Sequence, residues 1–207
     1  MAVRPLEATD RVADGVHKLD RASMRRLERA RARAKPPAHK FRLTVLAASV
    51  ADVVWCAGGW LYDRAVMGWD VEVAVAECPD DRPLHILGAR LVELDHVLGK
   101  ASPAGVPDAL SVSVGLYERD ARVQRYTTKE IGSNRTEVTL WGRDWPTELS
   151  RLRPVEHRLS LAAQAFKAQA MAAAGESPDL GGVAESFRIC RRHLSPTRDT
   201  PDLELTI

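Results

Sequence analysis

Three acidic side chains lie at or shortly after the ends of apolar segments of this sequence, where a carboxylate could act as a general acid or base. Asp52 follows the apolar run 41–48, Glu77 ends the alternating run 69–77, and Asp120 follows the alternating run 109–116. In open α/β sheets, ligands bind outside the carboxyl ends of the strands, near the point where the strand order reverses. Position alone, with no supporting motif, makes these three residues candidates for catalysis.

The same positional rule selects residues that would bind a ligand. The arginines among them suit an anion, because a guanidinium pairs bidentately with phosphate or carboxylate and helix N-termini favour negative charge. The selected residues are Ser49, Gly88, Arg90, Tyr117, Arg119, Gly142 and Arg143. The alternative is that these arginines form ordinary surface ion pairs with acidic neighbours such as Glu118, Asp120 and Asp144.

The usual motifs for cofactors and nucleophiles are missing. The segment AASVAD after the first apolar run lacks both G-x-G-x-x-G and G-x-x-x-x-G-K-[ST], which disfavours dinucleotide binding and P-loop hydrolysis. Cys190 and His193 form C-x-x-H without a second pair of ligands, so no metal is expected. Ser49 lacks a G-x-S-x-G elbow, and Ser111 and Ser113 are interpreted as small residues beneath a packed helix. The cofactor stays unknown.

Apolar periodicity predicts the elements that would position these residues. We expect strands at 41–48, 69–77, 84–87, 109–116 and 137–141, and helices at 50–67, 90–98, 120–131 and 154–174. Ser49 is predicted to cap the first helix, and Gly68 and Gly175 to end two of them. The alternation predicts an α/β fold with an open, doubly wound, mostly parallel sheet of about five strands. In outline, residues 41–174 resemble Rossmann-like or flavodoxin-like domains, which host many activities.

Charge divides the chain further. Residues 1–40 carry 11 Lys and Arg against 5 Asp and Glu, whereas the remainder carries 19 against 23. We therefore expect a basic arm at 1–40, an α/β domain at 41–175, and an irregular segment at 176–207 with an edge strand at 203–207. The arm would bind nucleic acid without sequence specificity, or remain a solvated basic helix. Its arginines are Arg21, Arg25, Arg26, Arg29, Arg31 and Arg33.

Two tryptophans of the first helix suggest an interface. Trp55 and Trp60 lie about 140° apart around a helix, so one would enter the core and the other would face a protein partner or a second copy in a homodimer. Between them, Gly58 and Gly59 would allow close helix packing. The run 43–62 is long enough to span a membrane, but Asp52 at its middle disfavours this. No secretory signal precedes it, and three scattered cysteines fit a cytoplasmic protein.

These observations lead to three functional hypotheses. The first is a cytoplasmic module that binds an anionic small molecule or a protein partner at the carboxyl edge of its sheet, without catalysis. The second is an enzyme that acts on a phosphorylated or nucleotide-like small molecule at the same edge. The third is non-specific association with nucleic acid through the basic arm.

Overall fold

The computed structural model describes residues 40–77, 80–99, 105–133, 135–142, 145–149, 152–177, 182–190 and 204–205. Residues 1–39 and residues 40–207 form two separate units. The arginine-rich arm predicted at 1–40 lies outside the described residues, apart from Lys40. Its order and its binding to nucleic acid therefore stay predictions.

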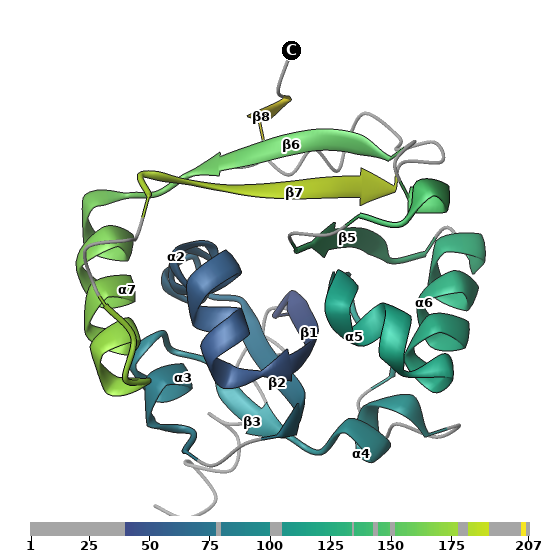
Figure 1. Ribbon diagram of the computed structural model, residues 1–207, viewed down its shortest axis with the longest axis horizontal. Helices are drawn as coiled ribbons and strands as arrows, with labels where there is room; N and C mark the ends of the chain where they lie inside the picture. The colour runs from purple at the N-terminus through teal and green to yellow at the C-terminus, as the bar shows by residue number, and fades with distance from the viewer. Residues whose placement is uncertain are drawn as a thin grey trace, which may run out of the picture. The chain divides into compact units, whose positions relative to one another are not determined.

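The described strands of the second unit form one eight-stranded sheet with the order β3-β2-β1-β4-β5-β7-β6-β8 (Figure 1). The parallel part comprises β1 (Arg42–Ser49), β2 (Asp70–Glu77), β3 (Arg90–Val92), β4 (Ala109–Ser113) and β5 (Glu137–Trp141). The antiparallel part comprises β6 (Arg153–Arg158), β7 (Ala184–Cys190) and β8 (Glu204–Leu205). The prediction of an α/β fold with a mostly parallel sheet is confirmed.

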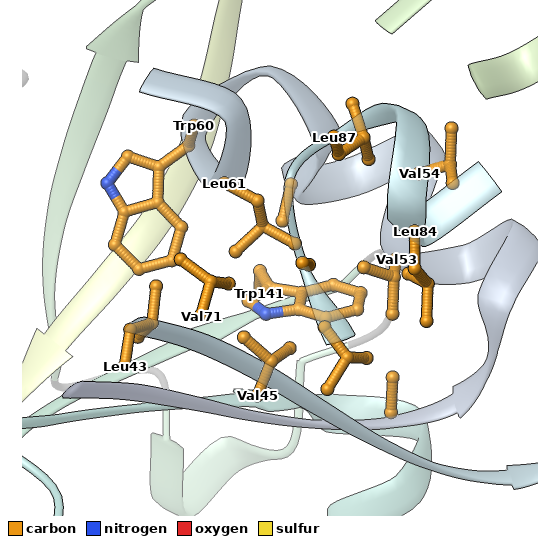
Figure 2. Close-up of a cluster of buried hydrophobic side chains, with 14 of the residues drawn as sticks. Leu43, Val45, Val53, Val54, Trp60, Leu61, Val71, Leu84, Leu87 and Trp141 are labelled. Carbon is orange, nitrogen blue, oxygen red and sulfur yellow. The ribbon is translucent and has the colours of Figure 1, made fainter. Parts of the chain in front are cut away.

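Helices cover both faces of the parallel part (Figure 1). One face carries α2 (Val50–Val66), α3 (Arg82–Ile86) and α7 (Leu161–Ala173), and the other carries α4 (Leu94–Leu98), α5 (Val114–Arg119) and α6 (Ala121–Ser133). A short 3₁₀ helix, η1, spans Thr147–Leu149. Each face has its own hydrophobic core. Figure 2 shows the core beneath α2, where Trp60 and Leu61 pack with Trp141.

The unit β1-α2-β2 follows directly from its sequence. The hydroxyl of Ser49 accepts a hydrogen bond from the amide of Asp52 at 3.2 Å and so caps α2, as predicted. At the other end, Gly68 adopts a φ of +89°, a left-handed conformation that favours glycine and ends the helix. The alternating valines of β2 then pair with β1 in parallel register. None of the described helices has the length and hydropathy that a membrane span requires.

The prediction of a strand at 84–87 is wrong. These residues belong to α3 and its C-terminal turn, and Pro83 lies in the first turn of this helix, where proline is tolerated. Leu84 and Leu87 are both fully buried, and their spacing of three suits one helical face as well as it suits a short apolar run. The third strand, β3, comes later and takes the first residues of the helix predicted at 90–98.

The C-terminal third also differs from its prediction. The long helix expected at 154–174 is divided into β6 and α7, because Val155 and His157 alternate inward and Ser160 caps a new helix. Residues 184–190, within the segment expected to be irregular, form β7 between β5 and β6. The edge strand expected at 203–207 is present as β8, which pairs with β6.

Gly59 provides the first testable prediction. A Cβ at this position would lie 2.5 Å from Cδ2 of Leu159, so Gly59→Ala should destabilise the fold by about 1–3 kcal/mol, despite the helix propensity of alanine. Gly132, in α6, is the matched control, because a Cβ there meets no atom within 4 Å. Gly132→Ala should stabilise by about 0.5–1 kcal/mol, as measured by urea denaturation. Equal effects of the two substitutions would contradict the packing of α2 against Leu159.

Candidate active site at the carboxyl edge of the sheet

The order of the parallel strands reverses between β1 and β4. From β1 the chain passes to β2 and β3 on one side, whereas β4 and β5 lie on the other side. The helices that follow the two central strands take opposite faces, α2 on one and α5 on the other (Figure 1). Ligands of open α/β sheets bind in the crevice at this kind of switch point. The carboxyl ends of β1 and β4 are therefore the expected position of an active site.

Asp52 and Ser113 meet across this switch point. The hydroxyl of Ser113, which ends β4, donates a hydrogen bond of 2.9 Å to Oδ2 of Asp52, in the first turn of α2. The thiol of Cys56 lies 3.9 Å from the other carboxylate oxygen, Oδ1. Asp52 forms no ion pair with any described residue. It is a half-buried carboxylate whose described hydrogen-bond donors, the Ser113 hydroxyl and the Cys56 thiol, are neutral.

A cation lies close to the same place. A Cβ added to Gly115 would be 3.7 Å from Oγ of Ser113 and 3.8 Å from Nη2 of Arg119, so both atoms lie beside the start of α5. Arg119 is exposed and has no hydrogen bond or ion pair with the described residues. A guanidinium in this position can stabilise negative charge on a bound molecule.

Three other predicted residues share this edge. Ser49 pairs with Glu77 in the register of β1 and β2, and the Glu77 side chain is exposed at the end of its strand. Gly142 follows β5 with a φ of +149°, and a Cβ there would lie 3.1 Å from Cβ of Val114. Glycine at this position therefore lets the end of β5 approach the start of α5. Arg143 lies outside the described residues.

The prediction is wrong for Gly88 and Arg90, because the strand expected at 84–87 is a helix. Both residues precede the strand β3 or begin it, so they lie at the amino end of the parallel sheet, opposite Asp52. Arg90 forms ion pairs there with Asp70, at 3.2 Å, and with Glu72. These contacts, the hydrogen bond with Asp70 above all, raise the pKa of Arg90. Arg90 is thus a surface ion-pair residue, as the alternative interpretation held.

Asp120 is held ionised and is a poor candidate for a general base. Its carboxylate accepts hydrogen bonds from the guanidinium of Arg122 at 2.7 Å and from the Arg122 amide at 2.8 Å, and these contacts lower its pKa to about 2. Arg122 also binds Asp95 at 2.7 Å. A carboxylate with so low a pKa accepts a proton weakly near neutral pH.

The low pKa of Asp120 has a measurable effect on stability. A group whose pKa is lowered on folding stabilises the protein above its ordinary pKa, and this contribution is lost as the pH falls through the folded value. The advantage of wild type over Asp120→Asn should therefore disappear between about pH 4 and about pH 2. A carbon-detected NMR titration of the Asp120 carboxyl should give a midpoint near 2. A midpoint near 4 would mean that Arg122 does not hold this side chain in solution.

The two tryptophans of α2 have different surroundings. Trp60 is fully buried and packs against Phe187 with ring centroids 4.9 Å apart, so it is not available to a partner. Trp60 is therefore the tryptophan that enters the core, and it is excluded as an interface residue. Trp55 is half-buried and packs against the edge of the same core, and its role in an interface or homodimer stays a prediction.

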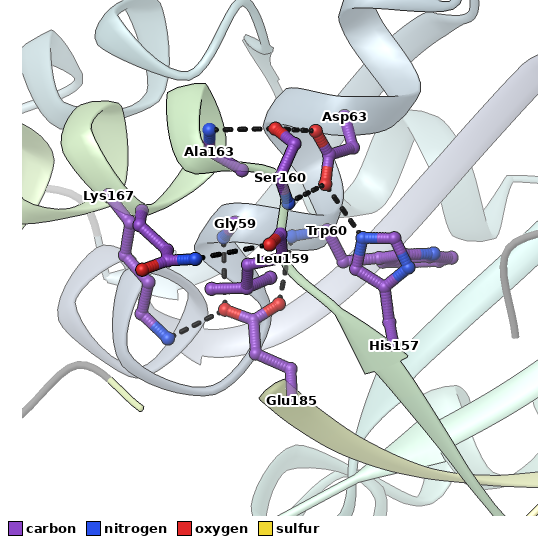
Figure 3. A network of polar contacts seen from close by, with 10 residues as sticks. Gly59, Trp60, Asp63, His157, Leu159, Ser160, Ala163, Lys167 and Glu185 are labelled. Atoms are coloured by element: carbon purple, nitrogen blue, oxygen red, sulfur yellow. Dashed lines mark hydrogen bonds and ion pairs between the residues drawn. The ribbon is translucent and has the colours of Figure 1, made fainter. Parts of the chain in front are cut away.

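A second group of polar side chains lies where α2, α7 and the strands β6 and β7 meet (Figure 3). Nε2 of His157 lies 2.8 Å from Oδ2 of Asp63, and the Ser160 hydroxyl donates to Oδ1 of Asp63 at 2.6 Å. The serine contacts the carboxylate and not the imidazole, which is not the arrangement of an activated nucleophile. Ser160 also caps α7, so this group joins the helices to the sheet.

The sequence did not reveal Ser113 as a site residue. Its interpretation as a small residue beneath a helix fits Ser111, which is fully buried and bonded to Thr139, but not Ser113, which reaches Asp52. The missing information was the strand order, because only the neighbouring position of β1 and β4 brings Ser113 beside Asp52. In the part of the chain that the structure describes, no three His, Cys, Asp or Glu side chains are grouped to bind a metal ion.

The fold is shared with several solved structures. The 4-carboxy-2-hydroxymuconate hydratase GalB from Pseudomonas putida KT2440 matches with a TM-score of 0.55 and 13% identity, over 77% of this chain and 99% of that chain. The A40926 pseudoaglycone deacetylase Dbv21 matches with a TM-score of 0.51 and 15% identity, over 75% and 99%. A deacetylase in complex with teicoplanin matches with a TM-score of 0.50 and 15% identity, over 74% and 100%. No protein-family model and no curated protein sequence matches the chain.

These comparisons correct the first functional hypothesis. At this identity the likeness establishes the fold, and these three neighbours that carry the fold are enzymes by name. The interpretation as a module without catalysis depended on the lack of cofactor and nucleophile motifs in the sequence. We abandon this interpretation because these neighbours are enzymes. The second hypothesis, an enzyme at the same edge, agrees better with the neighbours. Its phosphorylated or nucleotide-like substrate stays a prediction.

Proposed function

We propose that this protein is an enzyme that activates water at the switch point between β1 and β4, with Asp52 as the general base. The observation that carries this proposal is the Asp52 carboxylate, half-buried at the carboxyl edge of the sheet and hydrogen-bonded by Ser113 without an ion-pair partner among the described residues. Such a carboxylate can take a proton from a water molecule as the water attacks a substrate.

The reaction that we propose is hydrolysis of an acetylated amine. The water oxygen attacks the acetyl carbonyl carbon while its proton passes to Asp52, and the carbonyl oxygen gains negative charge. The carbon–nitrogen bond then breaks, and Asp52 returns the proton to the leaving amine. The products are acetate and a free amine, and Asp52 is again ionised. No other reactant is needed.

Two further residues have supporting roles in this proposal. The Ser113 hydroxyl fixes the orientation of the Asp52 carboxylate through its 2.9 Å hydrogen bond, and Ser113 itself is 1% exposed. It acts as a positioning residue. Arg119 lies beside Ser113 with its guanidinium uncommitted to any described residue, and it would stabilise the charge that develops on the carbonyl oxygen.

The names of the structural neighbours support a reaction that consumes water. A deacetylase adds water across an acyl bond, and a hydratase adds water to a carbon–carbon double bond. Both reactions require a base that takes a proton from water, which is the role given to Asp52. The hydratase is the reason to keep hydration of an unsaturated acid as a second candidate reaction.

The test is a substrate panel with the purified full chain. Acetylated amino sugars and acetylated amino acids, each with and without a phosphate group, are incubated with the protein, and released acetate is measured by proton NMR. Unsaturated carboxylic acids are followed in parallel by loss of ultraviolet absorbance. The proposal expects turnover in one of these groups. No turnover in either group, or turnover unaffected by loss of the Asp52 carboxylate, would overturn it.

A further inference from the structure

A hollow on α5 and α6 is lined by none of the residues described around Asp52. It has a volume of about 410 Å³ and is lined by Tyr117, Gln124, Arg125, Thr128 and Lys129. The four residues from α6 recur at helical spacing, so they form one face of this helix, and all four are exposed to solvent. We refer to these five residues as the basic hollow.

The charges in the basic hollow are not neutralised internally. Arg125 forms no hydrogen bond or ion pair with any described residue. Lys129 has one ion-pair partner, Glu130, with Nζ 4.0 Å from Oε1, which is the limit of such a contact. The hydroxyl of Thr128 donates its hydrogen to the backbone carbonyl of Gln124 at 2.8 Å. This hydroxyl is therefore not available as a donor to an anion. The free donors are the Arg125 guanidinium, the Lys129 ammonium and the Gln124 amide.

Tyr117 is the observation that distinguishes the hollow from an ordinary basic surface. Its side chain lines the hollow and is only 8% exposed, yet it has no hydrogen-bond partner among the described residues. Its ring is buried, whereas its hydroxyl is open to solvent in the hollow. The Tyr117 hydroxyl therefore provides a third donor in the hollow, beside the Arg125 guanidinium and the Lys129 ammonium.

We infer that the basic hollow binds the oxyanion of a small molecule, with the charge and geometry of a phosphoryl group. The guanidinium of Arg125 can donate two parallel hydrogen bonds to phosphate oxygens, and Lys129 contributes a second positive charge. The Tyr117 hydroxyl donates to a third oxygen. The ligand is either free phosphate or a phosphate ester. This inference does not depend on the proposed reaction, because it uses none of the residues around Asp52.

The test locates binding residue by residue. Amide NMR spectra of the isotope-labelled full chain are recorded during titration with inorganic phosphate, with glucose 6-phosphate, and with glucose as the neutral control. The expected shifts concentrate at Tyr117 and at 124–129, with none for glucose. Tighter binding of glucose 6-phosphate identifies an ester site, and equal binding identifies a site for the phosphoryl group alone. Location matters because residues 1–39 contain further arginines that would also attract phosphate.

Two variants and a control make the test specific. Arg125→Gln should raise the dissociation constant for glucose 6-phosphate at least about tenfold, because it removes a positive charge and the bidentate donor. Tyr117→Phe should raise it about threefold, because it removes a single hydroxyl donor. Arg153→Gln removes the same charge from an exposed position on β6 and should leave the dissociation constant unchanged within a factor of about two. The inference is overturned if the control weakens binding equally, if chloride causes the same shifts, or if no shift appears at these residues with about 20 mM phosphate.

Discussion

Replacing Asp52 with Asn is expected to lower kcat of the proposed water-adding reaction by a factor of about 10² to 10⁴, the usual contribution of a general base. The substitution keeps the shape of the side chain, and the amide oxygen of the introduced asparagine can still accept the hydrogen bond from Ser113 that now measures 2.9 Å. It removes only the negative charge and the ability to take a proton. The loss should therefore appear in kcat, while the melting temperature changes little.

Glu77 is the rival base at the same edge, because it ends the neighbouring strand and its side chain is exposed. Glu77→Gln should reduce turnover much less than Asp52→Asn, since no described side chain orients its carboxylate. A larger loss of turnover in Glu77→Gln would assign the role of base to Glu77 and contradict the assignment to Asp52.

Ser113→Ala should reduce turnover less than Asp52→Asn does. The reduction should be seen mainly in kcat, because Ser113 positions the carboxylate without reacting.

The sequence predicted well where local and tertiary signals agree. The segment from β1 to β2 combines a buried apolar run, the Ser49 cap, the Gly68 helix end and alternating valines, and its elements have nearly the predicted bounds. The strand β5 was predicted residue by residue. In these segments the hydrophobic period is unambiguous, and a cap or a glycine marks the boundary.

The prediction was wrong where a short segment fits two periods. Leu84 and Leu87 fit a helical face and an apolar strand equally, and this error moved Gly88 and Arg90 to the wrong edge of the sheet. The strand β7 was missed because Pro- and Gly-rich sequence surrounds it, although its pairing with β5 and β6 supplies backbone partners that no local pattern reveals. The Asp52–Ser113 contact likewise depends on the order of the strands in the sheet, which no local sequence pattern indicates.

The largest expected effect on stability comes from a buried ion pair between α7 and β7 that also contacts the backbone of α2. Nζ of Lys167 lies 2.6 Å from Oε1 of Glu185, with side-chain exposures of 5% and 2% (Figure 3). The Glu185 carboxylate also accepts hydrogen bonds from the amides of Gly59 at 2.9 Å and Trp60 at 2.8 Å, in the middle of α2. The Lys167 ammonium also donates to the carbonyl of Trp55, one turn before Gly59 in α2, at 2.7 Å. The pair thus joins α7 and β7 to the backbone of α2.

Lys167→Met should lower the free energy of unfolding by about 3–5 kcal/mol, because it leaves a buried carboxylate without its cation and the Trp55 carbonyl without this donor. Glu185→Gln should cost a similar amount by leaving the ammonium uncompensated. The double variant should cost clearly less than the two single losses together, since no buried charge remains. Urea denaturation of the four proteins measures this cycle. The exposed pair Arg122–Asp95 is the control, and Asp95→Asn should cost less than about 1 kcal/mol.

The pH dependence gives this prediction a second readout. Burial raises the pKa of Glu185 above its ordinary value of 4.5, and removal of Lys167 raises it further, because the ammonium favours the ionised form. An acid whose pKa is raised on folding stabilises the protein below its unfolded pKa, and that contribution is lost as the pH rises. The stability deficit of Lys167→Met should therefore grow as the pH rises from 4.5 through the raised pKa of Glu185. A deficit that stays constant over this interval would mean that Glu185 is not ionised beside Lys167, and that hydrogen bonds and packing alone join α7 and β7 to α2.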